Sequence, residues 1–198
     1  MTGPSPVHYG WWLAARASGL VALGLVTASV ALGLLMASGL LRRPGLKRSL
    51  LAVHEHTALV ALGAMVVHGA TLLADRWLHP GLGGVLVPFT MAYRTAFTGL
   101  GIIAAYLAAL LGLSFYARRG IGARRWRKAH RLTVVVYVLA VVHALGAGTD
   151  GGATWLRVAI IATAAPIAWL FVARVLPRAR AQRRPRDDRR PRPVEELS

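Results

Sequence analysis

Four histidines inside otherwise apolar stretches constrain this sequence more than any other feature. His54 and His68 lie fourteen residues apart in HEHTALVALGAMVVH, and His130 and His143 lie thirteen apart in HRLTVVVYVLAVVH. In a helix rising about 1.5 Å per residue, the two histidines of each stretch are separated by roughly 20 Å, which is too far to share one metal ion. Imidazole is a good axial ligand of haem iron. Two helices that cross a membrane in the same direction could therefore bind two haems, one above the other.

The composition predicts an all-α, polytopic membrane protein. Of the 198 residues 56% are hydrophobic, and the mean hydropathy of +0.52 is high for a soluble domain of this size. We expect five membrane-spanning helices, at residues 17–41, 50–74, 95–117, 129–147 and 153–176. Cysteine is absent, which excludes disulfides, thiolate-bound metals and a cysteine nucleophile. The sequence also lacks a Walker loop, a dinucleotide-binding glycine motif and a serine nucleophile motif.

The segments between and beyond these helices are short or polar. We expect residues 75–92 to form a loop on the membrane surface and Pro166 to kink the fifth helix. Residues 1–10 lack the basic start and cleavage site of a signal peptide, so they are expected to form a short tail. The Arg-rich residues 177–198 have no apolar periodicity and should be disordered. The predicted organisation is a helical bundle over residues 1–176 and a basic tail over 177–198.

The positive charge is distributed on one side of the predicted topology. Of 24 Lys and Arg residues, 20 fall in residues 42–48, 118–131 and from Arg174 onward. The positive-inside rule then places the N-terminus outside and the C-terminus in the cytoplasm. The excess charge therefore indicates topology and contact with anionic lipid, and we expect no nucleic-acid partner.

In this topology the histidines match in depth. His54 and His130 begin outward-running helices, and His68 and His143 lie near the ends of the same helices, so we expect one pair at each face. A lone intramembrane histidine is otherwise explained by a hydrogen bond to a neighbouring helix, but four at matched depths favour a functional role. Fourteen residues return to within about 40° of the same helical face, whereas thirteen leave an offset of about 140°. The fourth helix therefore needs a tightened turn, or its haems are approached from different sides; the sequence leaves both open.

The remaining histidines and several arginines are secondary candidates. His56 has a poorer phase relative to His68 and could face headgroups or a haem propionate, whereas His8 and His79 are expected to be solvated. Arginines at helix ends either pair with haem propionates or extend to the membrane surface. We take Arg94 as a cofactor-binding candidate on the outer side and Arg131 on the inner side. The others at these positions are Arg76, Arg157, Arg127 and Lys128.

The chain resembles the ferric reductase-like transmembrane family, which includes ferric reductases, the membrane part of NADPH oxidases and the haem subunit of the bacterial periplasmic methionine sulfoxide reductase. The similar features are the two histidine spacings, LLAD after His68, VPF and Tyr93–Arg94, RWRKAHRLT, and GTD after His143. The resemblance implies that His54, His68, His130 and His143 are axial ligands of two b-type haems. It also implies electron transfer from a cytoplasmic flavin to an acceptor outside.

The chain departs from the larger relatives in two respects that limit its activity. Full ferric reductases and NADPH oxidases have six spans followed by FAD- and NADPH-binding domains, whereas this sequence predicts five spans and a short tail. We therefore expect a separate flavin reductase or a quinol as donor, a ferric chelate or redox protein as external acceptor, and a bacterial-type plasma membrane as location. The alternative is a haem-free membrane scaffold or small transporter that uses its histidines for packing or proton transfer.

Overall fold

The computed structural model describes residues 6–39 and 45–175, with side chains from residue 9 onward, and these residues are folded as α-helices without strands. The helices are α1 (Pro6–Ser38), α2 (Leu46–Ala74), α3 (Gly81–Leu86), α4 (Thr95–Leu113), α5 (Arg118–Ile121), α6 (Ala123–His130), α7 (Thr133–Ala147) and α8 (Thr154–Val175). Five segments are long and apolar enough to cross a membrane: α1, α2, α4, α6 together with α7, and α8. The predicted all-α bundle with five spans is confirmed.

The observed bounds differ from the predicted ones mainly at the membrane surfaces. Helix α1 begins eleven residues earlier than expected, at Pro6, where the fixed φ of proline suits a first helical position. The basic segment 118–131, expected as a connection, is largely helical as α5 and α6, and the loop 75–92 contains the short helix α3. The proposed tail 177–198, part of the first basic turn and the side chain of His8 lie outside the described residues.

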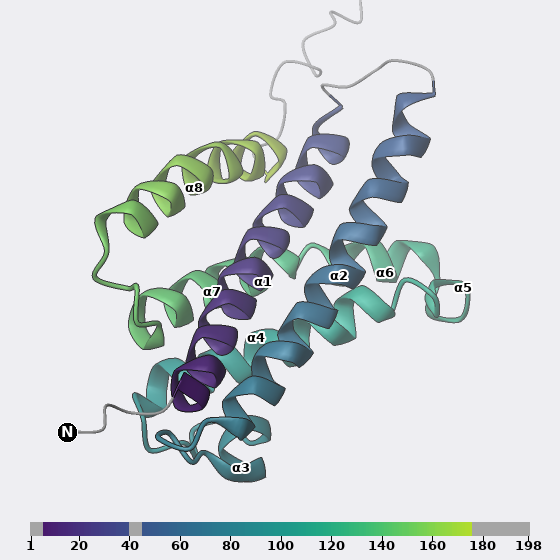
Figure 1. Ribbon diagram of the computed structural model, residues 1–198. Helices are drawn as coiled ribbons and strands as arrows, with labels where there is room; N and C mark the ends of the chain where they lie inside the picture. Colours follow the sequence, from purple (N-terminus) through teal and green to yellow (C-terminus); the bar gives the residue numbers. More distant parts are fainter. Residues whose placement is uncertain (1–5, 40–44, 176–198) are drawn as a thin grey trace, which may run out of the picture.

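Two antiparallel hairpins make the bundle. Helix α1 packs along α2, and α4 packs along α7 (Figure 1). Helix α1 also contacts α7 and α8, so it lies at the centre of the assembly. Their shared core is built from apolar residues of all five spans: Val26, Val30, Leu34, Ala61, Leu111, Val136, Tyr137, Ile167 and Leu170. Among the described residues, neither α6 nor α7 packs closely against α2.

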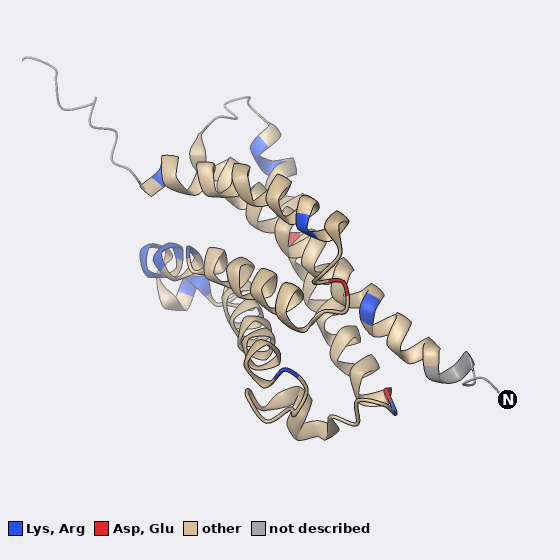
Figure 2. Ribbon diagram, turned by 90° about the vertical axis from the view of Figure 1, so that its left-hand side faces the viewer, with Lys and Arg blue, Asp and Glu red and all other residues tan. Residues whose placement is uncertain are grey.

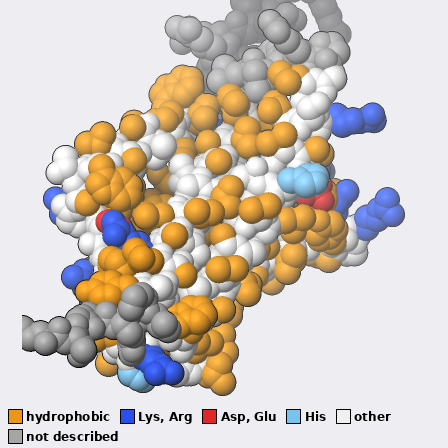
Figure 3. Space-filling model, viewed as in Figure 1, with side chains coloured by type: hydrophobic (Ala, Val, Ile, Leu, Met, Phe, Trp, Pro, Cys, Tyr) orange, Lys and Arg blue, Asp and Glu red, His pale blue; other side chains and the backbone are white. Residues whose placement is uncertain are grey.

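The outer surface of the bundle suits a lipid environment. Large apolar side chains such as Val66, Leu110 and Ile161 are about two-thirds exposed or more, at 72%, 67% and 68%. Hydrophobic side chains cover most of the face in Figure 3, and the charged side chains lie toward its edges. The Lys and Arg segments at the start of α2, in α5 and α6 and at the end of α8 lie together toward the upper left of Figure 2.

An ion pair ties α1 to the turn between α7 and α8. The Nε and Nη2 atoms of Arg16 donate to the two carboxylate oxygens of Asp150, and the guanidinium also lies 5.3 Å from the ring centre of Trp12. The Asp150 side chain is 11% exposed and that of Arg16 is 36% exposed. This contact fixes the first span against the second hairpin at the end of the bundle opposite the basic segments.

Candidate functional site

The four sequence-predicted histidines meet in two pairs between α2 and the α6–α7 segment. The ring centroids of His54 and His130 are 6.2 Å apart with an interplanar angle of 85°. Those of His68 and His143 are 6.3 Å apart with an angle of 79°. The pairs are those expected from matched depth. Each histidine of α2 thus faces one histidine of the other hairpin across a gap between the helices.

Backbone carbonyls of the neighbouring helices hold three of the four rings. The Nδ1 atom of His54 lies 2.9 Å from the carbonyl oxygen of Ser29, that of His68 lies 2.8 Å from Ala15, and that of His143 lies 2.9 Å from Phe97. A carbonyl oxygen can only accept a hydrogen bond, so Nδ1 carries the proton in each of these rings. The Nε2 atom is then left with its lone pair available to a ligand or metal.

Glycines on the same helices make room for these rings. A Cβ atom at Gly19 would lie 3.0 Å from the ring of His68, and one at Gly33 would lie 3.3 Å from the ring of His54. At Gly101 a Cβ atom would overlap the ring of His143. Each of these glycines lies four residues after the carbonyl that binds the same histidine.

A tightened turn between α6 and α7 accounts for the thirteen-residue spacing. The amides of Arg131, Leu132, Val134 and Val135 donate to carbonyls three residues earlier, at distances of 2.9 to 3.4 Å. Such i→i+3 bonds advance the chain by about 120° per residue instead of 100°. Roughly four such residues reduce the expected offset of about 140° to about 60°. The structure thus selects the tightened turn from the two alternatives that the sequence left open.

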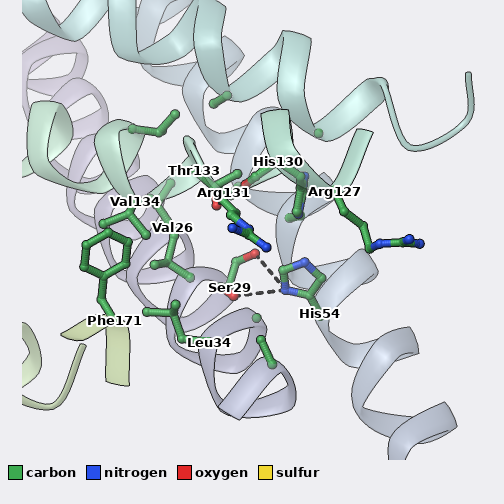
Figure 4. A pocket seen from close by; sticks show the side chains of 18 of the residues that line it. Val26, Ser29, Leu34, His54, Arg127, His130, Arg131, Thr133, Val134 and Phe171 are labelled. Atoms are coloured by element: carbon green, nitrogen blue, oxygen red, sulfur yellow. Dashed lines mark hydrogen bonds between the residues drawn. The ribbon is translucent and has the colours of Figure 1, made fainter. Parts of the chain in front are cut away.

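A cavity of about 610 Å³ opens beside the His54–His130 pair. It lies among α1, α2, α4, α6, α7 and α8, and arginines Arg127, Arg131 and Arg174 contribute to its lining. In Figure 4 the Arg131 side chain points into the cavity toward Ser29 and His54, whereas Arg127 extends away from it. The volume is typical of sites for small molecules and cofactors, and the cationic rim favours an anionic group.

The other sequence-predicted residues lie apart from the two pairs or bind backbone. The guanidinium of Arg94 donates to the carbonyl of Gly146, and Nε of Arg157 donates to the carbonyl of Gly151 at 3.1 Å. His56 is exposed, with Nδ1 2.7 Å from the carbonyl of Ala52 in its own helix. His79 and Arg76 are exposed as well.

Two polar contacts near the inner pair were missed by the sequence analysis. Trp126 stacks on His130 with ring centroids 4.7 Å apart, and its Nε1 donates to Oγ of Ser114 at 3.1 Å. Glu55, adjacent to His54, accepts a hydrogen bond of 2.8 Å from the hydroxyl of Tyr116, and this bond raises the pKa of Tyr116. The sequence could have indicated contact between Trp126 and His130, because residues four apart lie on the same face of a helix.

The acidic residues of the LLAD and GTD motifs have structural roles. Oδ1 of Asp75 accepts hydrogen bonds from the amides of Trp77 and Leu78, and thereby stabilises the turn that follows α2. Asp150 is the partner of Arg16. Within the described residues no three His, Asp or Glu side chains converge as a metal cluster. The chemistry available between the helices is therefore that of paired imidazoles.

These features define a five-span helical membrane protein with two histidine pairs at different depths. A family model described as ferric reductase like transmembrane component matches residues 18–141, which is more than half of the chain. The chain therefore belongs to the ferric reductase-like transmembrane family, and this membership indicates a role in membrane electron transfer. Comparisons with curated proteins and with solved structures gave no match.

Proposed function

We propose that this protein is a di-haem b-type cytochrome of the plasma membrane that passes electrons from a cytoplasmic donor to an acceptor on the outer face. His54 and His130 would hold the inner haem, and His68 and His143 the outer one. The haem irons supply reversible one-electron chemistry when bound. The chain would provide two imidazoles for each haem, an apolar environment and a fixed separation between the two histidine pairs.

The single observation that carries this proposal is the distance within each histidine pair. Metal–imidazole bonds are about 2.0 Å long, so two rings that would hold one metal between them must leave a gap between their nitrogen atoms. The observed separations are 6.2 and 6.3 Å. Among the described residues no third His, Asp or Glu joins either pair, and two imidazoles would suit the iron of a haem.

The hydrogen bonds behind the rings support the same role. Metal-binding histidines usually donate the other ring N–H to a carbonyl or carboxylate, which fixes the tautomer and raises the basicity of the ligating nitrogen. His54, His68 and His143 have such a bond. These bonds also fit the alternative of histidines used only for helix packing, but packing alone does not require two facing pairs at one separation.

The arginines near each pair provide counter-charges. Arg131 points into the cavity of the inner pair and is suited to bind a haem propionate there. Arg94 would do the same on the outer side, since its guanidinium has further N–H groups besides the one bound to Gly146. We assign both as cofactor-binding residues.

The distribution of charge supports the direction of transfer. The inner pair lies in the basic segments, because His130 is the last residue of α6 and His54 lies near the start of α2, after Lys47 and Arg48. The positive-inside rule assigns this side to the cytoplasm. A separate flavin reductase or a quinol would reduce the inner haem, and a ferric chelate or a redox protein would oxidise the outer one. A reporter fused after Ser198 should be cytoplasmic and one inserted at Gly81 external; the opposite result would reverse the direction.

A reduced-minus-oxidised spectrum of purified protein tests the proposal. The wild type should give a b-type spectrum with two haems per chain. His68→Ala and His143→Ala should each deplete one haem, and His54→Ala and His130→Ala the other. His56→Ala is the matched control, because His56 is exposed and binds its own helix. Absence of haem from the wild type would leave the packing role as the explanation.

A further inference from the structure

The supports of the two α2 histidines repeat along α1. Ala15 and Ser29, fourteen residues apart, accept the Nδ1–H bonds of His68 and His54. Four residues after each carbonyl, a glycine leaves room for the ring. Each support thus consists of a carbonyl, a glycine one turn later and a histidine from the adjacent helix.

Helix α4 repeats this support once but not twice. Phe97 and Gly101 serve His143 in the same way. Fourteen residues after Phe97 lies Leu111, whose backbone carbonyl is the corresponding acceptor for His130. However, the buried Nδ1 atom of His130 has no hydrogen bond of ordinary geometry to any described residue. The position four residues after Leu111 is Phe115, beyond the end of α4 at Leu113.

An aromatic stack holds the face of the His130 ring. The indole of Trp126 lies nearly parallel to the ring of His130, with an interplanar angle of 25°. The indole is anchored at two points, by the hydrogen bond from Nε1 to Ser114 and by the edge of Phe115, 5.8 Å away between ring centroids. Rotation of His130 about its side-chain bonds would break the stack, so the anchored indole restricts the orientation of the imidazole.

We propose that Trp126 is the positioning residue of His130, replacing by stacking the carbonyl bond that orients each of the other three histidines. This inference rests on the proposed function. It would make the two haem sites unequal, because the contact of His130 with the backbone of Leu111 does not have the good geometry of the N–H···O=C bonds that support the other three imidazoles. His130 is consequently the ligand that dissociates most readily when its support is removed.

Carbon monoxide gives a readout that a general loss of stability would not produce. A ferrous haem with two bound imidazoles has no free position for CO, whereas one that has lost an axial ligand binds it. In Trp126→Leu we expect CO binding at one of the two haems and a fall of about 10- to 100-fold in haem affinity at that site, the range for lost supporting contacts. The other haem should keep its spectrum and its reduction potential.

Matched variants separate the stack from indirect effects. Trp155→Leu removes an exposed tryptophan of α8 and should leave both haems inert to CO. Trp126→Phe keeps part of the stack but loses the bond to Ser114, so CO binding at one haem should be intermediate. This milder variant decides the matter if Trp126→Leu loses both haems.

The outcomes distinguish this inference from the proposed function. A wild type with two haems, together with a Trp126→Leu variant that binds both at wild-type affinity and does not react with CO, overturns the role of Trp126 and leaves the cytochrome intact. If Trp126→Leu loses both haems, the result for Trp126→Phe is decisive. Absence of CO binding by Trp126→Phe would also overturn the role of Trp126. A wild type without haem refutes the proposed function itself.

Discussion

At the scale of single residues, Gly101 has little freedom to change. It lies on α4 directly against the ring of His143, and a Cβ atom there would occupy the space of the imidazole. A Cβ atom added at Gly63 on α2 would meet no atom within 4 Å. Alanine is the better helix former at both sites by about 1 kcal/mol, so any difference between the two substitutions comes from the histidine.

Gly101→Ala should therefore displace His143, whereas Gly63→Ala should be neutral or slightly stabilising. Overpacking of this kind costs about 1–3 kcal/mol of the free energy of unfolding. Under the proposed function we also expect haem affinity at the outer site to fall by about 10- to 100-fold. Thermal unfolding and haem titration of the two variants measure both effects. Identical behaviour of Gly101→Ala and Gly63→Ala would show that the glycine does not matter for His143.

The ion pair between Arg16 and Asp150 allows a second comparison. Asp150 is the more buried partner, so Arg16→Gln leaves a charged carboxylate in a site with little water. Asp150→Asn leaves a partly exposed guanidinium that can reach solvent and can still bond to the amide oxygen. Unfolding in detergent should show a loss of about 2–3 kcal/mol for Arg16→Gln and about 1 kcal/mol for Asp150→Asn. Equal losses, or a larger loss for Asp150→Asn, would contradict this ranking.

At the scale of elements, α5 and α6 form a basic surface next to the inner histidine pair. Arg119, Arg124 and Arg125 are exposed, and Trp126 is directed inward by its stack with His130. A surface of one sign of charge accelerates association with an oppositely charged partner, and salt screens this effect. The helical form of this segment gives these arginines a fixed arrangement that a flexible connection would lack.

Replacing Arg119, Arg124 and Arg125 with Gln should slow reduction by an acidic cytoplasmic flavoprotein. We expect a decrease of about 10-fold or more in the bimolecular rate at low salt. The variant and the wild type should converge at high salt, where the Debye length is about 3 Å at 1 M. Arg76→Gln, at an exposed position beyond the other end of α2, is the control. A decrease that persists unchanged at high salt would indicate damage to the site instead of lost steering.

Much of this arrangement could be predicted from the sequence, and the exceptions have physical causes. Hydropathy and length suffice to locate five spans, because a membrane requires long uncharged helices. Depth matching suffices to pair His54 with His130, since topology fixes the direction of each helix. The tightened turn at Arg131 was left open because i→i+3 bonds leave no clear mark in composition. The stack of Trp126 on His130 was missed because it depends on where α4 ends.

At the scale of the whole molecule, the two hairpins are arranged alike. Helices α1 and α4 each offer a carbonyl and a glycine to histidines on the partner helix, α2 or α7. Each hairpin contributes one histidine to each pair, so neither pair exists without both hairpins. The two histidine pairs lie at different depths in the bundle. Their separation, roughly 20 Å along α2, follows from the fourteen-residue spacing between His54 and His68.

Under the proposed function, two haems at different depths would form a relay that can be interrupted at one step. Electrons from a cytoplasmic donor would reach the inner site first, because His130 is the last residue of the basic helix α6. The outer site would receive them only from the inner one. Under the proposed function the electrons come from a separate donor, so we expect NADPH to be oxidised only when a reductase is present.

Proteoliposomes test this order of transfer. With the protein oriented by its basic face inward, an external ferric chelate should be reduced only when a flavin reductase and NADPH are enclosed, and NADPH alone should have no effect. His68→Ala should abolish reduction of the chelate. The inner haem should still be reduced, because electrons can still pass from the donor to the site of His54 and His130. His56→Ala should transfer electrons at the wild-type rate, since that side chain is exposed and bonded to its own helix. Outward transfer at the original rate by the His68 variant would rule out the two-step relay.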